Sequence, residues 1–190
     1  MSQNFIRFFL AACAAALLTG CGSSDQFYRL SATAAAPVGR TSDLSVVVGP
    51  VSVPAYIDRA ELVFQAGDNE FQVPANVRWI GSLQENISRV LATNLGQILH
   101  SGRVRSSLET DSPGSYQIVL DIRQFHAISG REAILDVSWR IQNGASRTTL
   151  SRHTRSFREP IAGDGYNAVV TAESRLLEQC AEAIAQTLRR

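Results

Sequence analysis

Two long segments of the chain place apolar residues at the period of an amphipathic α-helix. The first spans residues 79–99, where Ser82 and Glu85 form a candidate capping box. The pair Ser101-Gly102 marks the end of this segment. The second spans residues 168–188 and carries its apolar residues on one face. The pattern therefore predicts two long helices, separated by a region of a different period.

Shorter apolar runs before the first helix predict strands. Residues 27–30 favour a short strand, and the β-branched run at 44–48 favours a buried strand that stops at Gly49-Pro50. Residues 51–56 hold a second proline, which indicates an extended segment outside the centre of a sheet. Two short runs within 61–73 flank a polar turn and predict a hairpin.

Between the two helices, the pattern alternates as expected for an antiparallel meander. Strands are predicted at 116–125 and 132–142, with the tight turn at Asn143-Gly144. The segment 148–157 has few apolar residues and predicts an edge strand. Together these elements predict an α/β fold. It is a compact single domain in which a mixed, mainly antiparallel sheet is packed by the two long helices.

The N-terminal residues resemble a bacterial lipoprotein signal. The apolar run at 8–18 rises about 16 Å as a helix, too short for a bilayer core of roughly 30 Å. It follows a positively charged start and precedes Leu18-Thr19-Gly20-Cys21, which resembles a lipobox. We therefore expect residues 1–20 to be a signal peptide and Cys21 to carry acyl chains such as palmitate. An ordinary secretory signal with a chance cysteine is the other interpretation.

The residues after Cys21 bear on where the protein is held. The residue after Cys21 is Gly22, not the aspartate that typically retains lipoproteins at the inner membrane. The resemblance therefore implies that the protein is held at the periplasmic face of the outer membrane. Residues 21–26 would form a lipidated tether, followed by one domain at 27–190. The five residues from Gly22 onward reach less than about 20 Å, so the domain is expected close to its membrane.

Charge and cysteine content exclude several functions. The 18 basic residues are all arginine, which excludes a P-loop lysine or a Schiff-base lysine, and the net charge of +1 disfavours nucleic-acid binding. Of the three cysteines, Cys13 would leave with the signal and Cys21 would be acylated. We expect no intramolecular disulfide, and a buried, unreactive thiol at Cys180 within the second helix.

No catalytic or metal-binding motif stands out. The three histidines, His100, His126 and His153, have no metal-ligand spacing, and solvated polar histidines are the expectation. A zinc site or a serine-histidine-aspartate triad would need residues gathered from distant segments. We therefore expect no enzyme activity and no cofactor or metal.

Two groups of residues are candidates for contact with partners. Arg147, Arg152, Arg155 and Arg158 concentrate on the last strand, where they could bind an acidic partner or simply protect a sheet edge from aggregation. The second group, near Pro54 and before the first helix, suits a protein interface: Tyr56, Arg59, Arg78 and Trp79. In the other interpretation Trp79 packs in the core and Arg59 pairs with a nearby acid.

Several of these segments resemble the ABC-type transport auxiliary lipoproteins, the PqiC/YmbA-like family. The resemblance rests on Val48-Gly49-Pro50-Val51-Ser52-Val53-Pro54-Ala55-Tyr56-Ile57-Asp58-Arg59, on Arg78-Trp79 and on Asn86 to Leu95. Trp139, Glu159-Pro160 and Ser174-Arg175 extend it through the C-terminal half. The order and spacing of these segments carry the resemblance, not any single motif.

The resemblance implies a compact α/β domain and a non-enzymatic role in lipid transport between membranes. Such lipoproteins serve MCE-domain proteins and permease subunits, so the expected function is an auxiliary docking subunit that supports membrane integrity. Contact with outer-membrane lipids would run through acylated Cys21. The alternative is a periplasmic carrier that binds a lipid itself, between helices and sheet. A homo-oligomer is also compatible with the sequence.

Overall fold

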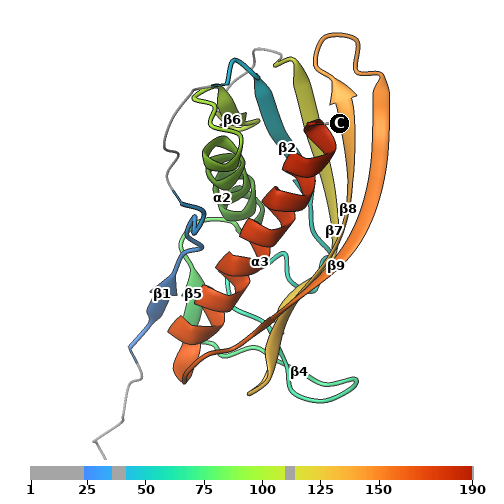
Figure 1. Ribbon diagram of the computed structural model, residues 1–190. Coiled ribbons are helices and arrows are strands. Elements are labelled where there is room, and N and C mark those ends of the chain that lie inside the picture. Colours follow the sequence, from blue (N-terminus) through green and yellow to red (C-terminus); the bar gives the residue numbers. More distant parts are fainter. Residues whose placement is uncertain (1–23, 36–41, 110–113, 190) are drawn as a thin grey trace, which may run out of the picture.

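The computed structural model describes residues 24–35, 42–109 and 114–189 (Figure 1). The strands are β1 (Gln26–Tyr28), β2 (Val46–Ser52), β3 (Phe64–Gln65), β4 (Phe71–Gln72), β5 (Val77–Trp79), β6 (Val104–Ser106), β7 (Tyr116–Ile128), β8 (Glu132–Asn143) and β9 (Thr149–Pro160). The helices are α2 (Leu83–Ile98) and α3 (Gly165–Leu188). Within these ranges, no helix combines the length and the apolar character needed to cross a bilayer.

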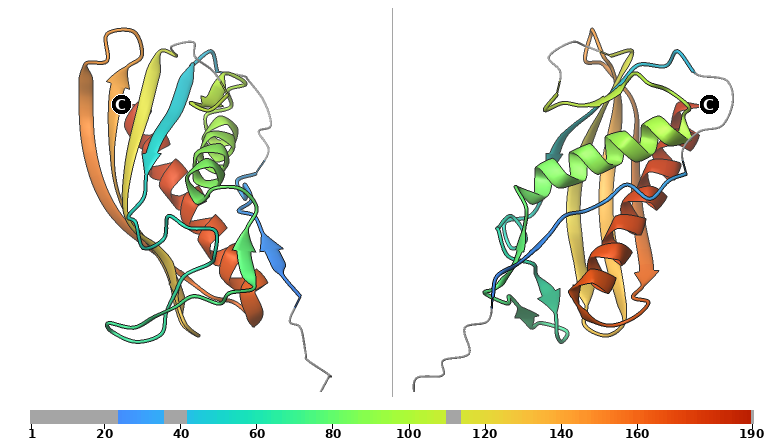
Figure 2. Two further views of the ribbon diagram at one scale, coloured as in Figure 1. Left: turned by 180° about the vertical axis from the view of Figure 1, so that it is seen from behind. Right: turned by 90° about the vertical axis from the view of Figure 1, so that its left-hand side faces the viewer.

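A seven-stranded mixed sheet forms one layer, and both helices cover the same face of it (Figures 1 and 2). The long strand β7 pairs antiparallel with β8 along one edge. Along its other edge, β7 pairs in parallel with β2 at its start and with β3 at its end. Strands β6, β4 and β9 complete the sheet beside β2, β3 and β8, and β1 and β5 form a separate parallel ribbon. The predicted α/β class is confirmed.

The core lies between this sheet and the helices. Ile118, Leu120 and Ile122 alternate along β7 and are all buried there. Cys180 of α3 is also fully buried, and burial raises the pKa of its thiol to about 12. The expected inert thiol is therefore consistent with its surroundings, because a thiol that stays protonated is a poor nucleophile.

Strand β2 corrects the prediction of a stop at Gly49-Pro50, because it continues to Ser52. The pairing with β7 shifts in register between Val48 and Val51, so the two intervening residues are accommodated as a bulge. Gly49 has φ +119°, a conformation that side-chain-bearing residues rarely adopt. Strand β6 pairs only with the residues before Gly49, so the missing N–H of Pro50 interrupts no β2–β6 hydrogen bond.

The first helix starts four residues later than predicted, at Leu83 instead of position 79. Trp79 belongs to β5, and Gly81 with φ +77° separates that strand from the helix. Ser82 is the N-cap, and its hydroxyl accepts the backbone N–H of Glu85 at 3.2 Å, as the capping pattern predicted. At the other end, the left-handed residue is His100, not Gly102.

The two predicted hairpins differ in outcome. Strands β3 and β4 pair antiparallel around the polar turn, which confirms the first. Between β8 and β9 the turn is longer than predicted, and Arg147 has the positive φ that was expected at Asn143-Gly144. The Asn143 side chain instead accepts the N–H groups of Ala145 and Ser146, both at 3.0 Å. Among the described residues β9 pairs with β8 alone, so the predicted edge strand is confirmed.

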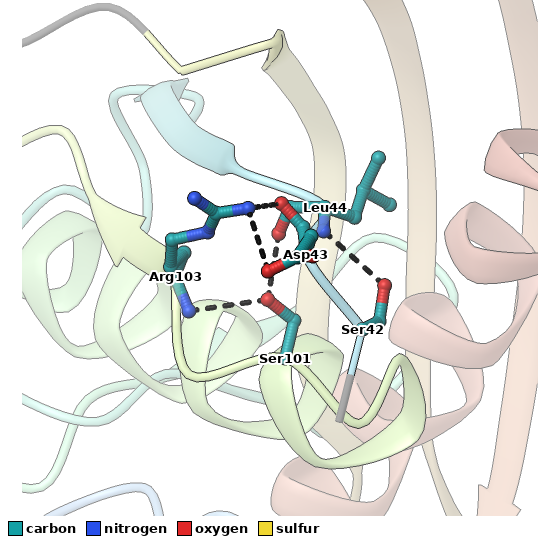
Figure 3. Close-up of polar contacts among 5 residues, drawn as sticks. All are labelled: Ser42, Asp43, Leu44, Ser101 and Arg103. Carbon is teal, nitrogen blue, oxygen red and sulfur yellow. Dashed lines mark hydrogen bonds and ion pairs between the residues drawn. The ribbon is translucent and has the colours of Figure 1, made fainter. Parts of the chain in front are cut away.

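A polar cluster fixes the start of β2 against the turn that follows α2 (Figure 3). The Ser101 hydroxyl donates to the carbonyl of Leu44 at 2.6 Å and accepts the N–H of Arg103 at 3.1 Å. The Arg103 guanidinium also pairs with the carboxylate of Asp43 at 3.2 Å and bonds the Asp43 carbonyl. These contacts join segments about sixty residues apart in the chain.

The segment after β1 lies across both helices and is here named the strap, residues Ser31–Ala34 (Figure 2). The N–H of Ser31 donates to the Ser174 hydroxyl of α3 at 3.1 Å. The N–H groups of Thr33 and Ala34 both donate to the side-chain carbonyl of Asn94 in α2, at 3.0 and 3.1 Å. The strap therefore ties the N-terminal ribbon to the helix layer.

Candidate docking surface around the Pro54 turn and strand β5

A tight turn after β2 presents the first predicted interface residues. The carbonyl of Pro54 accepts the N–H groups of Ile57 and Asp58 at 3.1 and 3.2 Å. Ile57 is buried in the core and anchors the turn, whereas Tyr56 and Arg59 on either side of Ile57 and Asp58 are exposed. The sequence forms this turn because Pro54 fixes its own φ and a buried isoleucine follows it three residues later.

Arg59 and Arg78 are brought together by one carboxylate. Glu61 Oε2 accepts from Arg59 Nε at 3.0 Å, and Glu61 Oε1 accepts from Arg78 Nη2 at 3.0 Å. Glu61 also forms an isolated antiparallel β-bridge with Arg78, so it lies beside β5. The hydrogen bond from Arg59, more than that from Arg78, holds the pKa of this carboxyl below its usual range. The result is an ordered pair of guanidinium groups on one edge, with Arg59 exposed and Arg78 half-buried.

Tyr56 is tied to a different part of the fold. Its hydroxyl lies 3.0 Å from Nδ1 of His126, and Nε2 of the same ring lies 3.2 Å from Oε1 of Gln65. Since Gln65 Oε1 can only accept, Nε2 carries the proton and Nδ1 accepts from the tyrosine. The exposed ring of Phe71 packs against Tyr56, with centroids 5.3 Å apart. This chain of contacts joins the Pro54 turn to the β3–β4 hairpin.

His126 corrects the expectation of solvated histidines, because only 1% of it is exposed. Burial lowers its pKa to about 4, Arg158 adds to this effect, and Asp136 opposes it. Burial also raises the pKa of the Tyr56 hydroxyl. A neutral imidazole that accepts from a protonated tyrosine is a structural bridge, since neither group is poised as a nucleophile. Across the described ranges, no group of three potential ligands is arranged to hold a metal ion.

Trp79 occupies the core below this surface, with 6% of the residue exposed. It therefore supports β5 and offers a partner little surface in this conformation. The four predicted residues thus separate into three roles: an arginine pair, an aromatic bridge and a buried support. Sequence reasoning missed Glu61, His126 and Phe71, although an acid two positions after Arg59 was a local signal for the pairing. Cys21 and the signal peptide lie outside the described residues.

The arginines of β9 lie on different faces of the sheet. Arg158 pairs with Asp136 at 3.1 Å. Arg152 lies directly opposite Arg140 of β8, a like-charge pair on the face that the helices do not cover. Arg155 instead lines a cavity of about 330 Å³ between β9 and α3, beside Trp139. Both interpretations of these arginines, partner contact and edge protection, stay open.

Comparison with known proteins identifies a family. The family described as ABC-type transport auxiliary lipoprotein component matches residues 28–185. A search of curated proteins finds no match.

Solved structures share the fold. One uncharacterised protein is 18% identical, with a TM-score of 0.71, covering 87% of this chain and 99% of its own. A Xanthomonas campestris protein of family DUF330 is 15% identical, with a TM-score of 0.69, covering 86% of this chain and 95% of its own. At these identities the likeness extends to the fold alone.

Proposed function

The chain belongs to the family of ABC-type transport auxiliary lipoprotein components, and from this premise we propose a specific role within such a system. The protein is a non-enzymatic docking subunit, anchored by acylated Cys21 at the periplasmic face of the outer membrane. Its partners are an MCE-domain protein and permease subunits that move lipids between the membranes. The observation that carries the proposal is the family match over nearly the whole described domain.

The surface around the Pro54 turn supports docking as the mode of action. Arg59 and Arg78 are held by Glu61 before any partner arrives, so little side-chain entropy is lost on binding. Tyr56 adds an exposed aromatic ring held by His126. Arginine and tyrosine are enriched where protein interfaces derive most of their energy. We therefore place the partner-binding surface at Tyr56, Arg59 and Arg78, with Trp79 as the support beneath.

The interior favours docking over lipid carriage. Leu91 and Leu95 of α2 and Leu176 and Ile184 of α3 belong to the same continuous core as the strands of the sheet. Helices and sheet are therefore in direct contact through apolar side chains. A carrier that encloses acyl chains would need to separate these layers, at the cost of the buried contacts. This packing supports the docking proposal.

The first test is affinity purification of the lipidated protein from gently solubilised membranes, with Cys21→Ser as the control and mass spectrometry as the readout. We expect the wild-type protein to recover an MCE-domain protein and a permease. Recovery of the protein alone with bound lipid would contradict docking and favour the carrier. A secreted Cys21→Ser form that fully restores membrane integrity would argue against the anchor.

A second test addresses the surface. Arg59→Glu combined with Arg78→Glu places two carboxylates beside that of Glu61, and we expect it to abolish recovery of the partners. Arg105→Glu is the matched control, because Arg105 is an exposed arginine on β6, far from this surface. If both variants recover the partners equally well, the docking surface lies elsewhere on the domain.

A further inference from the structure

Two large apolar side chains are exposed at the ribbon of β1 and β5. Phe27 is 57% exposed and Ile80 is 54% exposed. Phe27 belongs to β1, and Ile80 directly follows β5 and donates its N–H to the carbonyl of Tyr28 in β1 at 2.8 Å. The parallel register sets Phe27 opposite Arg78, and Val77 and Trp79 on the alternate positions are buried. Phe27 and Ile80 therefore lie on the side of the ribbon that faces away from the core.

A surface cavity with two arginines adjoins this apolar pair. It has a volume of about 390 Å³ and lies between residues 29–32 and the first turns of α2. Arg29 and Arg89 line it together with Ile80, and both arginines are exposed. Glu85 is the acidic residue of the same lining, so the cavity offers two cationic groups and one anionic group. Apolar side chains beside guanidinium groups form an amphipathic surface.

The chain length before β1 limits what can cover this surface. Strand β1 starts at Gln26, five residues after Cys21. Even fully extended, such a segment spans less than about 20 Å. An acyl anchor at Cys21 therefore keeps the ribbon end of the domain near the bilayer. The β8–β9 turn lies at the opposite end of the molecule (Figure 1).

We infer that Phe27, Ile80, Arg29 and Arg89, named here the ribbon surface, rest on the phospholipid headgroups of the membrane that holds acylated Cys21. This inference rests on the proposed lipid anchor. Phe27 and Ile80 enter the boundary between headgroups and acyl chains, where aromatic and aliphatic side chains are favoured. Arg29 and Arg89 contact headgroup phosphates, with their aliphatic stems along the apolar pair.

The ribbon surface and the docking surface adjoin at β5 without competing. The Arg78 guanidinium is held by Glu61, on the side of β5 away from β1. Arg29 and Arg89 lie toward the strap and α2. Arg78 and Phe27 share the outward face of the ribbon, so the membrane would lie at the β1 edge of this face and the protein partner at the Glu61 edge.

The experiment places an environment-sensitive NBD label at single introduced cysteines in the full lipidated protein. The chain allows this because Cys180 is buried and Cys21 would be acylated. Labels go at Phe27→Cys and Ile80→Cys, and Leu150→Cys is the control because it is also 54% exposed but lies at the start of β9, by the β8–β9 turn. The protein is reconstituted into vesicles of phosphatidylethanolamine and phosphatidylglycerol, and co-flotation with the vesicles is checked against Cys21→Ser.

At positions 27 and 80 we expect a blue shift of NBD emission and quenching by headgroup-labelled lipid, with neither effect at position 150. If the protein floats and all three positions give the same emission and quenching, the inference about the ribbon surface is contradicted but the lipid anchor is not. If wild type and Cys21→Ser both fail to float, the anchor and the inference fall together. Arg29→Gln with Arg89→Gln is expected to reduce the shift at position 80, whereas Arg105→Gln leaves it unchanged. If the double variant and Arg105→Gln give the same emission shift at position 80, then Arg29 and Arg89 do not contact the headgroups.

Discussion

At the scale of single residues, His126 and Glu173 respond to pH in opposite directions. Both are buried in the folded chain. Burial lowers the pKa of His126 to about 4 and raises the pKa of Glu173 to about 8. Within the described chain, Oε2 of Glu173 has no hydrogen-bond partner, whereas His126 has one on each ring nitrogen. Each residue therefore resists the charge that it would carry in water.

His126 predicts a loss of stability in acid. The unfolded chain takes up this proton near pH 6.5 and the folded chain only near pH 4, so the free energy of unfolding falls as pH decreases through this interval. Between these pH values we expect the free energy of unfolding of His126→Gln to fall by about 2 kcal/mol less than that of the wild type, with solvent screening allowed for. Urea unfolding of both proteins between pH 7 and about pH 4 measures the difference. Parallel profiles would contradict the assignment.

Glu173 predicts the reverse trend in base. The unfolded carboxyl loses its proton near pH 4.5, whereas the folded one keeps it to about pH 8, so the free energy of unfolding falls as pH rises between these values. Glu173→Gln removes the ionisable group at nearly constant shape. We expect the variant to be more stable than wild type at pH 8 by about 2 kcal/mol. Thermal unfolding at pH 5 and pH 8 tests this, since no gain at pH 8 would refute it.

At the scale of elements, the two helices start in physically different ways. The Ser82 hydroxyl caps α2 by accepting the N–H of Glu85. Asp164 holds the same position before α3 but makes no side-chain cap hydrogen bond. Backbone donors at a helix start that lack such a partner depend on water or on other groups. Ser82 and Asp164 therefore allow a helix start with a side-chain cap to be compared with one without it, in the same molecule.

We expect Ser82→Ala to lower the free energy of unfolding by about 1 kcal/mol, because it leaves a helix donor without its partner. Asp164→Ala should have a smaller effect, since only the interaction with the helix dipole is lost. Chemical denaturation of both variants beside wild type gives the comparison. If both variants lose the same free energy of unfolding, the Ser82 cap hydrogen bond stabilises the protein no more than the charge of Asp164 does.

At the scale of the whole molecule, the sheet ends in two unequal edges. Strand β9 forms one edge over 12 residues, whereas the other side of the sheet ends in the short strands β6, of three residues, and β4, of two. A long edge invites pairing with another chain, and charged side chains discourage it. Arg152 and Arg158 lie on the uncovered face of β9, together with Arg140 of β8.

If the arginines protect this edge, replacing them should cause self-association. We expect Arg152→Val with Arg158→Val to aggregate at concentrations where wild type stays monodisperse, as followed by light scattering. Arg105→Val, in the short edge strand β6, should not aggregate. A soluble β9 variant would instead favour the other interpretation, in which these arginines serve an acidic partner.

The sequence predicted the elements better than the contacts between them. The helix at α3 and the strands β7 and β8 follow from periodicity, because their buried faces repeat every 3.6 or two residues. The extension of β2 past Gly49-Pro50 did not follow, because a bulge depends on the neighbouring strand. The same limit applies to the site. Arg78 meets Glu61 across 17 positions and Tyr56 meets His126 across 70, and no local pattern encodes such distances.

The strap has a mechanical consequence. Any pull on the chain before β1 acts along a strand that runs parallel to β5, so the hydrogen bonds of the ribbon are loaded in shear, all at once. Beyond the ribbon, the load passes through the strap to Ser174 and Asn94, and thus to both helices together. A force on the N-terminal chain is therefore distributed over β5 and both helices.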